Sequence, residues 1–180
     1  MTTASEFQEQ GVKLFQQRDF EAAARAFIQA QAAYEAEGKQ DMAAEMQTNI
    51  GLVHRALGEN QQALDAMQAA LHTFQTMNDT RRTGMVLGNL GGVYAALGDK
   101  EQAYNCYRQA ADIFEELGEK KLYGETLIAM GDLQVRDGKI VAGAATYETG
   151  LENLDDLSAS QKVIKGLLGI RNKLMGSRSE

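Results

Sequence analysis

The sequence contains no proline, no tryptophan and a single cysteine, Cys106. Hydrophobic residues make up 44% of the chain, which is enough to form a core, and they are mostly Ala, Leu and Met, which favour helices. One cysteine cannot form an internal disulfide, so a reducing, cytoplasmic location is the default expectation. We therefore predict an all-α, cytoplasmic protein.

Positive charge is also scarce, and the formal net charge is −7. Sequence-independent nucleic-acid binding needs clustered Lys and Arg, so the acidic balance argues against it, and it argues equally against docking on an anionic membrane surface. No apolar run is long enough to span a bilayer, and residues 1–6 lack the basic and apolar regions of a secretory signal. The expected partner is a protein or peptide, with no nucleic acid and no membrane insertion.

Patterns typical of catalysis or metal binding are missing as well. His54 and His72 lie outside any Cys-x-x-Cys or His-x-x-x-His spacing, which predicts no metal site. We interpret His54 as a packed core histidine and Cys106 as a buried or half-buried structural thiol. The Gly91-Gly92 pair is not followed by the Lys-Ser or Lys-Thr of a phosphate loop. The sequence therefore predicts a protein that is not an enzyme and that binds no metal or cofactor.

What the chain does contain is a pattern that recurs every 40 residues, and such a fixed period indicates a repeat array. One column of the pattern is glycine: Gly11, Gly51, Gly91 and Gly131. Two columns are small: Ala23, Ala63, Ala103 and Gly143, then Ala30, Ala70, Ala110 and Gly150. A fourth is bulky: Phe27, Met67, Tyr107 and Tyr147. A glycine inside a helix costs about 1 kcal/mol relative to alanine, so its recurrence indicates close helix approach.

Each repeat reads as two helices joined by a short turn, over about residues 1–40, 41–80, 81–120 and 121–157. The breaks fall where a left-handed residue is wanted: Gly38, Gly58, Asn78, Gly98, Gly118 and Gly138. The second helix of the fourth repeat is expected to run to about Asp156. Ser158 then begins a final helix over residues 158–176, with Gln161 completing a capping box, before a polar tail at 177–180.

The third repeat shows the full motif apolar-Gly-x-x-Tyr-x-x-x-Gly-Asp-x-x-x-Ala-x-x-x-aromatic-x-x-Ala. It is met by Leu90, Gly91, Tyr94, Gly98, Asp99, Ala103, Tyr107 and Ala110. This pattern resembles that of tetratricopeptide repeats, and the resemblance covers residues 5–157. The period exceeds the usual repeat of about 34 residues, and so resembles the subclass of Leu-Gly-Asn repeat proteins and kinesin light chains. The resemblance implies a right-handed superhelical solenoid of four helix-turn-helix repeats, closed by a C-terminal capping helix.

The resemblance also implies a non-enzymatic interaction scaffold or adaptor, which binds a peptide or helix of a partner in a concave groove lined by the first helices. Groove positions counted from the glycine column are Val12, Phe15, Asn49, Leu52, Arg55, Asn89, Gly92 and Asp132, and neighbouring turns add Glu45, Met85 and Arg136. Asn49 and Asn89 are the leading candidates, because a side-chain amide both donates and accepts and can hold a peptide backbone. The alternative is that each amide caps or bridges neighbouring helices.

Two further functions stay open. The final helix has two apolar stripes; one would cap the last repeat, and the other could mediate self-association in a homo-oligomeric assembly protein. We favour capping alone. The third possibility is a regulatory domain that resembles bacterial tetratricopeptide sensors of signalling peptides, although no output domain follows it in this sequence.

Overall fold

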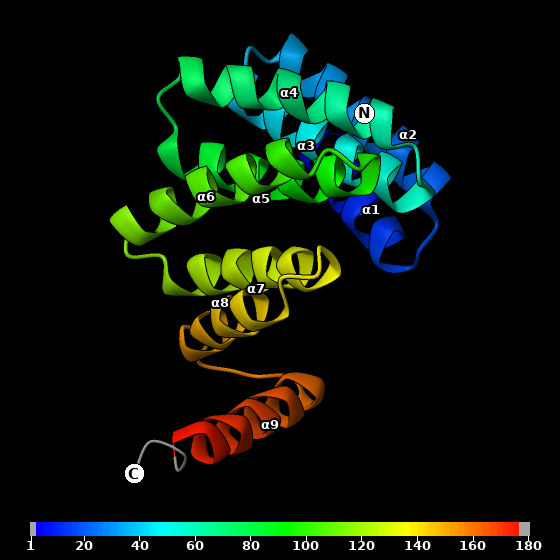
Figure 1. The fold of residues 1–180 in the computed structure, drawn as a ribbon. Helices are drawn as coiled ribbons and strands as arrows, with labels where there is room; N and C mark the ends of the chain where they lie inside the picture. The colour runs from blue at the N-terminus through cyan, green and yellow to red at the C-terminus, as the bar shows by residue number, and fades with distance from the viewer. Residues whose placement is uncertain (1–2, 177–180) are drawn as a thin grey trace. The chain divides into compact units, whose positions relative to one another are not determined.

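The computed structural model describes residues 3–176, with side chains described as far as Gly169. Within this range the chain is all helical, which confirms the predicted class (Figure 1). The helices are α1 (Ala4–Gln16), α2 (Phe20–Ala36), α3 (Gln40–Leu57), α4 (Asn60–Thr76), α5 (Thr80–Leu97), α6 (Lys100–Glu116), α7 (Lys120–Arg136), α8 (Ile140–Glu152) and α9 (Ala159–Gly176). The polar tail expected at 177–180 lies outside the described residues.

The turns between helices fall at the predicted left-handed residues. Gly38, Gly58, Gly98, Gly118 and Gly138 all have positive φ, between +68° and +84°, and Asn78 has φ +55°. Glycine adopts this conformation without a steric cost from Cβ, and Asn tolerates it better than most residues. The first repeat differs because Arg18 occupies its turn with φ +63°.

The end of the fourth repeat was predicted wrongly. Helix α8 ends at Glu152 instead of near Asp156. The Asn153 side-chain amide donates to the Thr149 carbonyl at 2.9 Å, and the Leu154 amide donates to Leu151 across three residues, so the backbone tightens and leaves the helix. The capping box that opens α9 is present, with Ser158 N–H donating to Gln161 Oε1 at 2.8 Å and Gln161 N–H to Ser158 Oγ at 3.3 Å.

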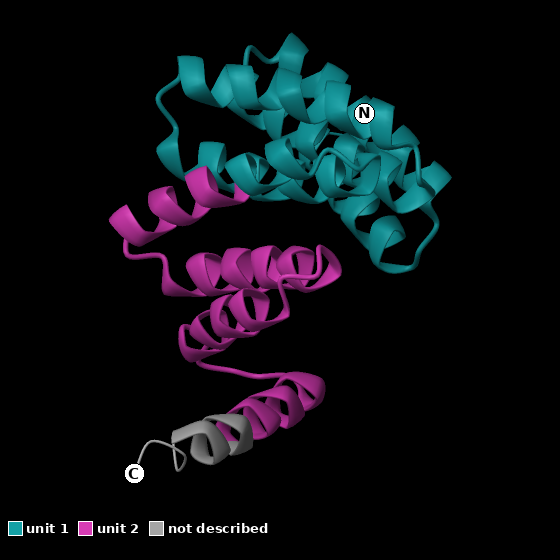
Figure 2. Ribbon diagram, viewed as in Figure 1, with its two compact units in different colours: residues 1–106 teal, residues 107–180 magenta. Residues whose placement is uncertain are grey.

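The chain forms two compact units, residues 1–106 and 107–180 (Figure 2). In the first unit, helices α1 to α5 pack in chain order, so that α2 lies against α1 and α3, and α4 against α3 and α5. Helices α3 and α5, the first helices of consecutive repeats, also touch directly. In the second unit, α7 packs along α8, and α8 contacts α9.

The small columns form the interior, and so do the bulky residues of the first three repeats, whereas Tyr147 in the fourth is half-buried. Ala23, Ala63, Ala30 and Ala70 are completely buried. Phe27 and Met67 are buried where they face the glycine column. A further small column, seven residues before the glycines, escaped the sequence analysis and is also buried: Ala4, Ala44, Gly84 and Gly124.

Candidate functional site

A chain of polar contacts joins the first helices of the first unit. The Tyr34 hydroxyl donates to Gln8 Oε1 at 2.6 Å, and Gln8 Nε2 donates to Glu45 Oε1 at 3.3 Å, which links α1 to α3. Arg82 at the start of α5 lies 3.6 Å from Glu45, and its Nη1 donates to Asp41 on α3 at 3.2 Å and to Asp79, the α5 N-cap, at 3.3 Å. These contacts hold α1, α3 and α5 in one row.

Arg82 is a structural residue that the sequence analysis missed. Its guanidinium also lies 5.5 Å from the centre of the Phe74 ring. The signal that could have found it is the spacing, because Asp41 and Glu45 stand about one repeat before Arg82 and on the same helix, one turn apart. The Arg82 guanidinium forms ion pairs with three carboxylates of the same chain, so these contacts stabilise the fold and the guanidinium is not available to a partner.

Asn49 and Asn89 are half-buried on α3 and α5, at equivalent positions of consecutive repeats. Neither side-chain amide forms a hydrogen bond with any residue in the described range. The alternative interpretation, in which each amide caps or bridges neighbouring helices, therefore finds no contact in this part of the chain. Both amides remain available to donate and to accept.

The other predicted groove residues of the first unit divide into two groups. Val12 and Met85 keep 41% and 40% of their surface exposed, Arg55 is exposed, and Leu52 and Gly92 are half-buried. A shallow depression of about 370 Å³ runs along α1, lined by Ser5, Gln8, Glu9, Val12, Lys13 and Gln16. This first group is open to a partner.

Phe15 and Glu45 form the second group, which is engaged within the fold. The Phe15 ring packs edge-on against Phe20, with centroids 5.4 Å apart, and lies against the core of the first repeats. Glu45 is held by Gln8 and Arg82. Their predicted contact with a partner would therefore compete with contacts that stabilise the first unit.

Asp132 and Arg136, the last two predicted groove residues, belong to the second unit. Both are exposed along α7. The Arg55, Asn49 and Asn89 side chains, by contrast, lie on helices of the first unit. The candidate site is therefore taken as the row of first helices in the first unit alone, and we name it the first-helix face: Val12, Asn49, Leu52, Arg55, Met85, Asn89 and Gly92.

The residues with reactive side chains are used structurally. His54 was predicted to be a packed core histidine, and this is wrong: its side chain is 26% exposed, and its Nδ1 lies 2.6 Å from Glu59 Oε2. Cys106 is buried, as predicted, and this burial, together with the nearby Asp99 carboxylate, raises the pKa of its thiol to about 11. The thiolate needed for nucleophilic chemistry is therefore rare at neutral pH.

Across residues 3–169, no three His, Cys, Asp or Glu side chains are grouped so that they could hold a metal ion. No helix in the described range has both the length and the apolar character needed to cross a membrane.

Comparison with known proteins identifies a matching family and solved structures of similar fold. A family model described as "SNAP: Soluble NSF attachment protein, SNAP" matches residues 1–168. No curated protein matches the chain.

Solved structures are similar to the chain in fold. The apo form of RapI superposes with a TM-score of 0.77 at 16% identity, over 97% of this chain and 51% of that one. BtubC (BKLC) from P. vanneervenii gives 0.67 at 18% identity, over 92% and 64% of the two chains. A tetratricopeptide repeat protein from Parabacteroides merdae gives 0.58 at 21% identity, over 97% and 60%. The chain thus spans roughly half to two thirds of these proteins, and they confirm a tetratricopeptide-like solenoid fold.

Proposed function

The chain belongs to the soluble NSF attachment protein family, and from this premise we propose that it is a non-enzymatic adaptor whose first-helix face binds a peptide or helix of a partner protein. The family name, soluble NSF attachment protein, describes attachment, which suits an adaptor. The similar solved structures include a tetratricopeptide repeat protein, and stacked helical repeats present extended surfaces of this kind to their ligands.

The observation that supports the proposal best is the pair of amides on Asn49 and Asn89. Each is half-buried and lacks a hydrogen-bond partner in the described residues, and neither has a polar atom that is buried and unsatisfied, so both amides are accessible to a ligand. An amide can accept from a peptide N–H and donate to a peptide carbonyl at once. Two such groups, one repeat apart on touching helices, would hold the backbone of a bound segment at two points.

The neighbouring residues define which side chains the partner should carry. Met85, Val12 and Leu52 offer apolar surface, so apolar partner residues are expected beside the amides. Gly92 has no side chain, so a ligand could approach the α5 backbone closely at that position. The Arg55 guanidinium is exposed and suits a bidentate contact with a carboxylate. The expected ligand is an apolar segment with at least one acidic residue.

Selection of peptides from a random displayed library against the full chain tests the proposal. Selected peptides should be apolar with an acidic position, and Asn49→Ala or Asn89→Ala should each weaken their binding about fivefold, the worth of a typical hydrogen bond. Gln29→Ala, which removes an exposed amide from α2, is the matched control and should bind as the parent does. Affinities are measured by calorimetry, and thermal unfolding confirms that each variant is folded.

Two outcomes would refute the first-helix face as the binding site. One is full peptide affinity in the Asn49→Ala/Asn89→Ala double variant. The other is an equal loss in Gln29→Ala, which would place the ligand on the second helices.

A further inference from the structure

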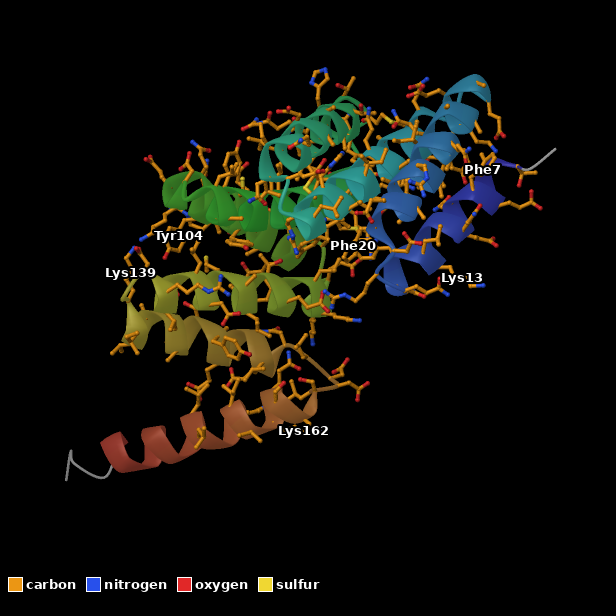
Figure 3. All side chains as sticks on the ribbon, turned by 90° about the vertical axis from the view of Figure 1, so that its right-hand side faces the viewer. Phe7, Lys13, Phe20, Tyr104, Lys139 and Lys162 are labelled. Atoms are coloured by element: carbon orange, nitrogen blue, oxygen red, sulfur yellow. The ribbon has the colours of Figure 1, made fainter. Side chains whose placement is uncertain are left out.

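Helix α9 stands out because its described side chains, from Ala159 to Gly169, are largely uncovered. From Ala159 to Gly169 every described side chain is exposed or half-exposed, including Val163 at 63% and Leu167 at 62% (Figure 3, where Lys162 marks the first turn). A methyl group added at Gly166 or Gly169 would meet no atom within 4 Å. The helix touches α8, yet the apolar stripe expected to cap the last repeat is not buried along this part of α9.

The exposed residues of α9 are segregated into an apolar and a basic face. At about 100° per residue, Val163 and Leu167 lie within about 40° of each other, and Ile164 adjoins them. Lys162 and Lys165 lie on the opposite side of the helix. The sequence continues the apolar spacing with Ile170 and Leu174, and by the same register it places the basic Arg171 on that side, about 40° from Leu167.

The charge of α9 is opposite to that of the chain as a whole. Between Ser158 and Gly176 the sequence has four basic residues and no Asp or Glu, whereas the net charge of the protein is −7. The chain as a whole is acidic, but salt screens charges beyond about 10 Å, so the local charge of an exposed helix decides which surface it can bind. A helix with an apolar face and a basic face, free of acidic residues, suits the boundary between acyl chains and anionic headgroups.

We propose that α9 is an interfacial anchor that lies flat on an anionic lipid surface. Val163, Ile164 and Leu167 enter the boundary of the acyl chains, while Lys162 and Lys165 face the headgroup phosphates. The helix adsorbs and does not cross the bilayer. This inference is independent of the first-helix face, which lies in the other unit.

A second copy of the chain suits this face less well than lipid does. A stable protein interface would need an apolar area of similar extent on the other copy. The α9 of a second copy carries the same apolar face, but it also brings four basic residues and no Asp or Glu, so two α9 helices would place like charges beside each other. A lipid boundary supplies continuous apolar contact beside negative charge, which matches both faces of α9.

Vesicle binding by the full chain tests the proposal. Because the protein has no tryptophan, Leu167→Trp provides a single fluorescent reporter at a side chain that is already 62% exposed. Vesicles of phosphatidylcholine with about 30 mol% phosphatidylglycerol should shift its emission to the blue and carry the protein upward in flotation. Phosphatidylcholine alone should do neither. Ile28→Trp on α2 is the control reporter and should show no shift with either vesicle.

Charge reversal then separates α9 from general electrostatics. In the Leu167→Trp background, Lys162→Glu/Lys165→Glu should lower the partition coefficient at least about tenfold, since each basic residue near an anionic surface contributes strongly. Lys120→Glu/Lys121→Glu on α7 changes the net charge equally and should leave partitioning within about twofold of the parent. Circular dichroism checks that all variants are folded.

Several results would overturn the anchor. These are no binding to the anionic vesicles, equal binding to phosphatidylcholine alone, or an equal loss in the α7 control pair. The same conclusion would follow if light scattering showed a dimer that Val163→Ser/Leu167→Ser dissociates, while the parent bound no vesicles. In that case α9 would contact a second copy.

Discussion

The hairpins α1–α2 and α3–α4 bring their helices together differently from α7–α8. A Cβ built on Gly11 would lie 2.6 Å from two ring atoms of Phe27, and one on Gly51 would lie 2.7 Å from Met67 Cγ. In both hairpins of the first unit, a glycine on the first helix receives a bulky side chain from the second. The space is filled by a side chain that has some freedom to move.

In α7–α8 the glycines face backbone instead. A Cβ on Gly131 would lie 2.9 Å from the Gly143 carbonyl oxygen, and one on Gly150 would lie 2.7 Å from the Gly124 carbonyl oxygen. Both helices contribute glycine, and their main chains touch at two levels. One repeat position therefore permits two kinds of close packing, and in the glycine-to-glycine kind a new side chain would meet backbone atoms, which cannot rotate away.

The largest effect expected from this difference is that of Gly131→Ala. The added methyl group would meet Gly143 O and the Tyr147 amide nitrogen, each at 2.9 Å, so the helices must separate. We expect a loss of about 2–3 kcal/mol in the free energy of unfolding, even after the roughly 1 kcal/mol that alanine gains in helix propensity. Urea unfolding measures it, and Gly166→Ala, where a Cβ meets nothing, should be neutral or stabilising. Parent-like stability of Gly131→Ala would disprove the backbone contact.

Removal of the arginine that links the first repeats should be the next largest effect. Arg82→Ala breaks the contacts with Asp41, Glu45 and Asp79 and the approach to Phe74. Because these side chains are about one third exposed, we expect about 1–2 kcal/mol of destabilisation, reduced at high salt. Arg25→Ala on α2, an exposed arginine, is the control. Equal urea midpoints for the two variants would mean that the network does not stabilise the first unit.

Gly51→Ala should cost less than Gly131→Ala. The new methyl group would crowd Met67, an unbranched side chain that can rotate, although Ala63 O at 3.2 Å limits the room. After the gain in helix propensity, a net loss of about 1 kcal/mol is expected. Urea unfolding of both variants gives the two losses in the free energy of unfolding. If Gly51→Ala lost as much as Gly131→Ala, the two kinds of hairpin would not differ in how they tolerate a side chain.

The smallest expected effect is a gain in stability at the first turn. The turn within each repeat has a residue with positive φ. In the second, third and fourth repeats this residue is Gly58, Gly98 and Gly138, whereas in the first it is Arg18. Arg18→Gly should raise the free energy of unfolding by about 0.5–1 kcal/mol, since the steric cost of Cβ exceeds the weak contact of its guanidinium with Phe20 at 5.9 Å. Differential scanning calorimetry should show a higher midpoint, and a lower one would indicate that the contact with Phe20 dominates.

Much of the fold could be predicted because a small residue that recurs at one helix position indicates close contact with another helix. A glycine at Gly51 or Gly131 is unfavourable in an isolated helix, so its recurrence pointed to helix contact, and the structure shows that contact. The turns followed from the rarity of positive φ outside glycine and Asn. The end of α8 was missed because it depends on the Asn153 side chain competing for a backbone carbonyl, a local choice that periodicity does not encode.

The candidate site was less predictable than the fold. Repeat register selected Asn49 and Asn89, and it equally selected Phe15 and Glu45, which the fold uses for its own contacts. The position of a residue within the repeat predicts which way its side chain points, but it does not predict which other side chains it contacts. His54 shows the same limit, since its position suggested burial while Glu59 across the turn holds it near solvent.

The sequence by itself determined the all-α class, the 40-residue repeat, the turns and the small residues where helices meet. These are consequences of period and of backbone sterics, which act within a few residues of one another. Only the tertiary structure decided that Arg82 gathers three carboxylates, that Gly143 meets Gly131 main chain to main chain, and that the apolar face of α9 stays uncovered between Val163 and Leu167. Each of these depends on which surfaces come together from distant parts of the chain, and hydrophobic burial favours contact without specifying the partner.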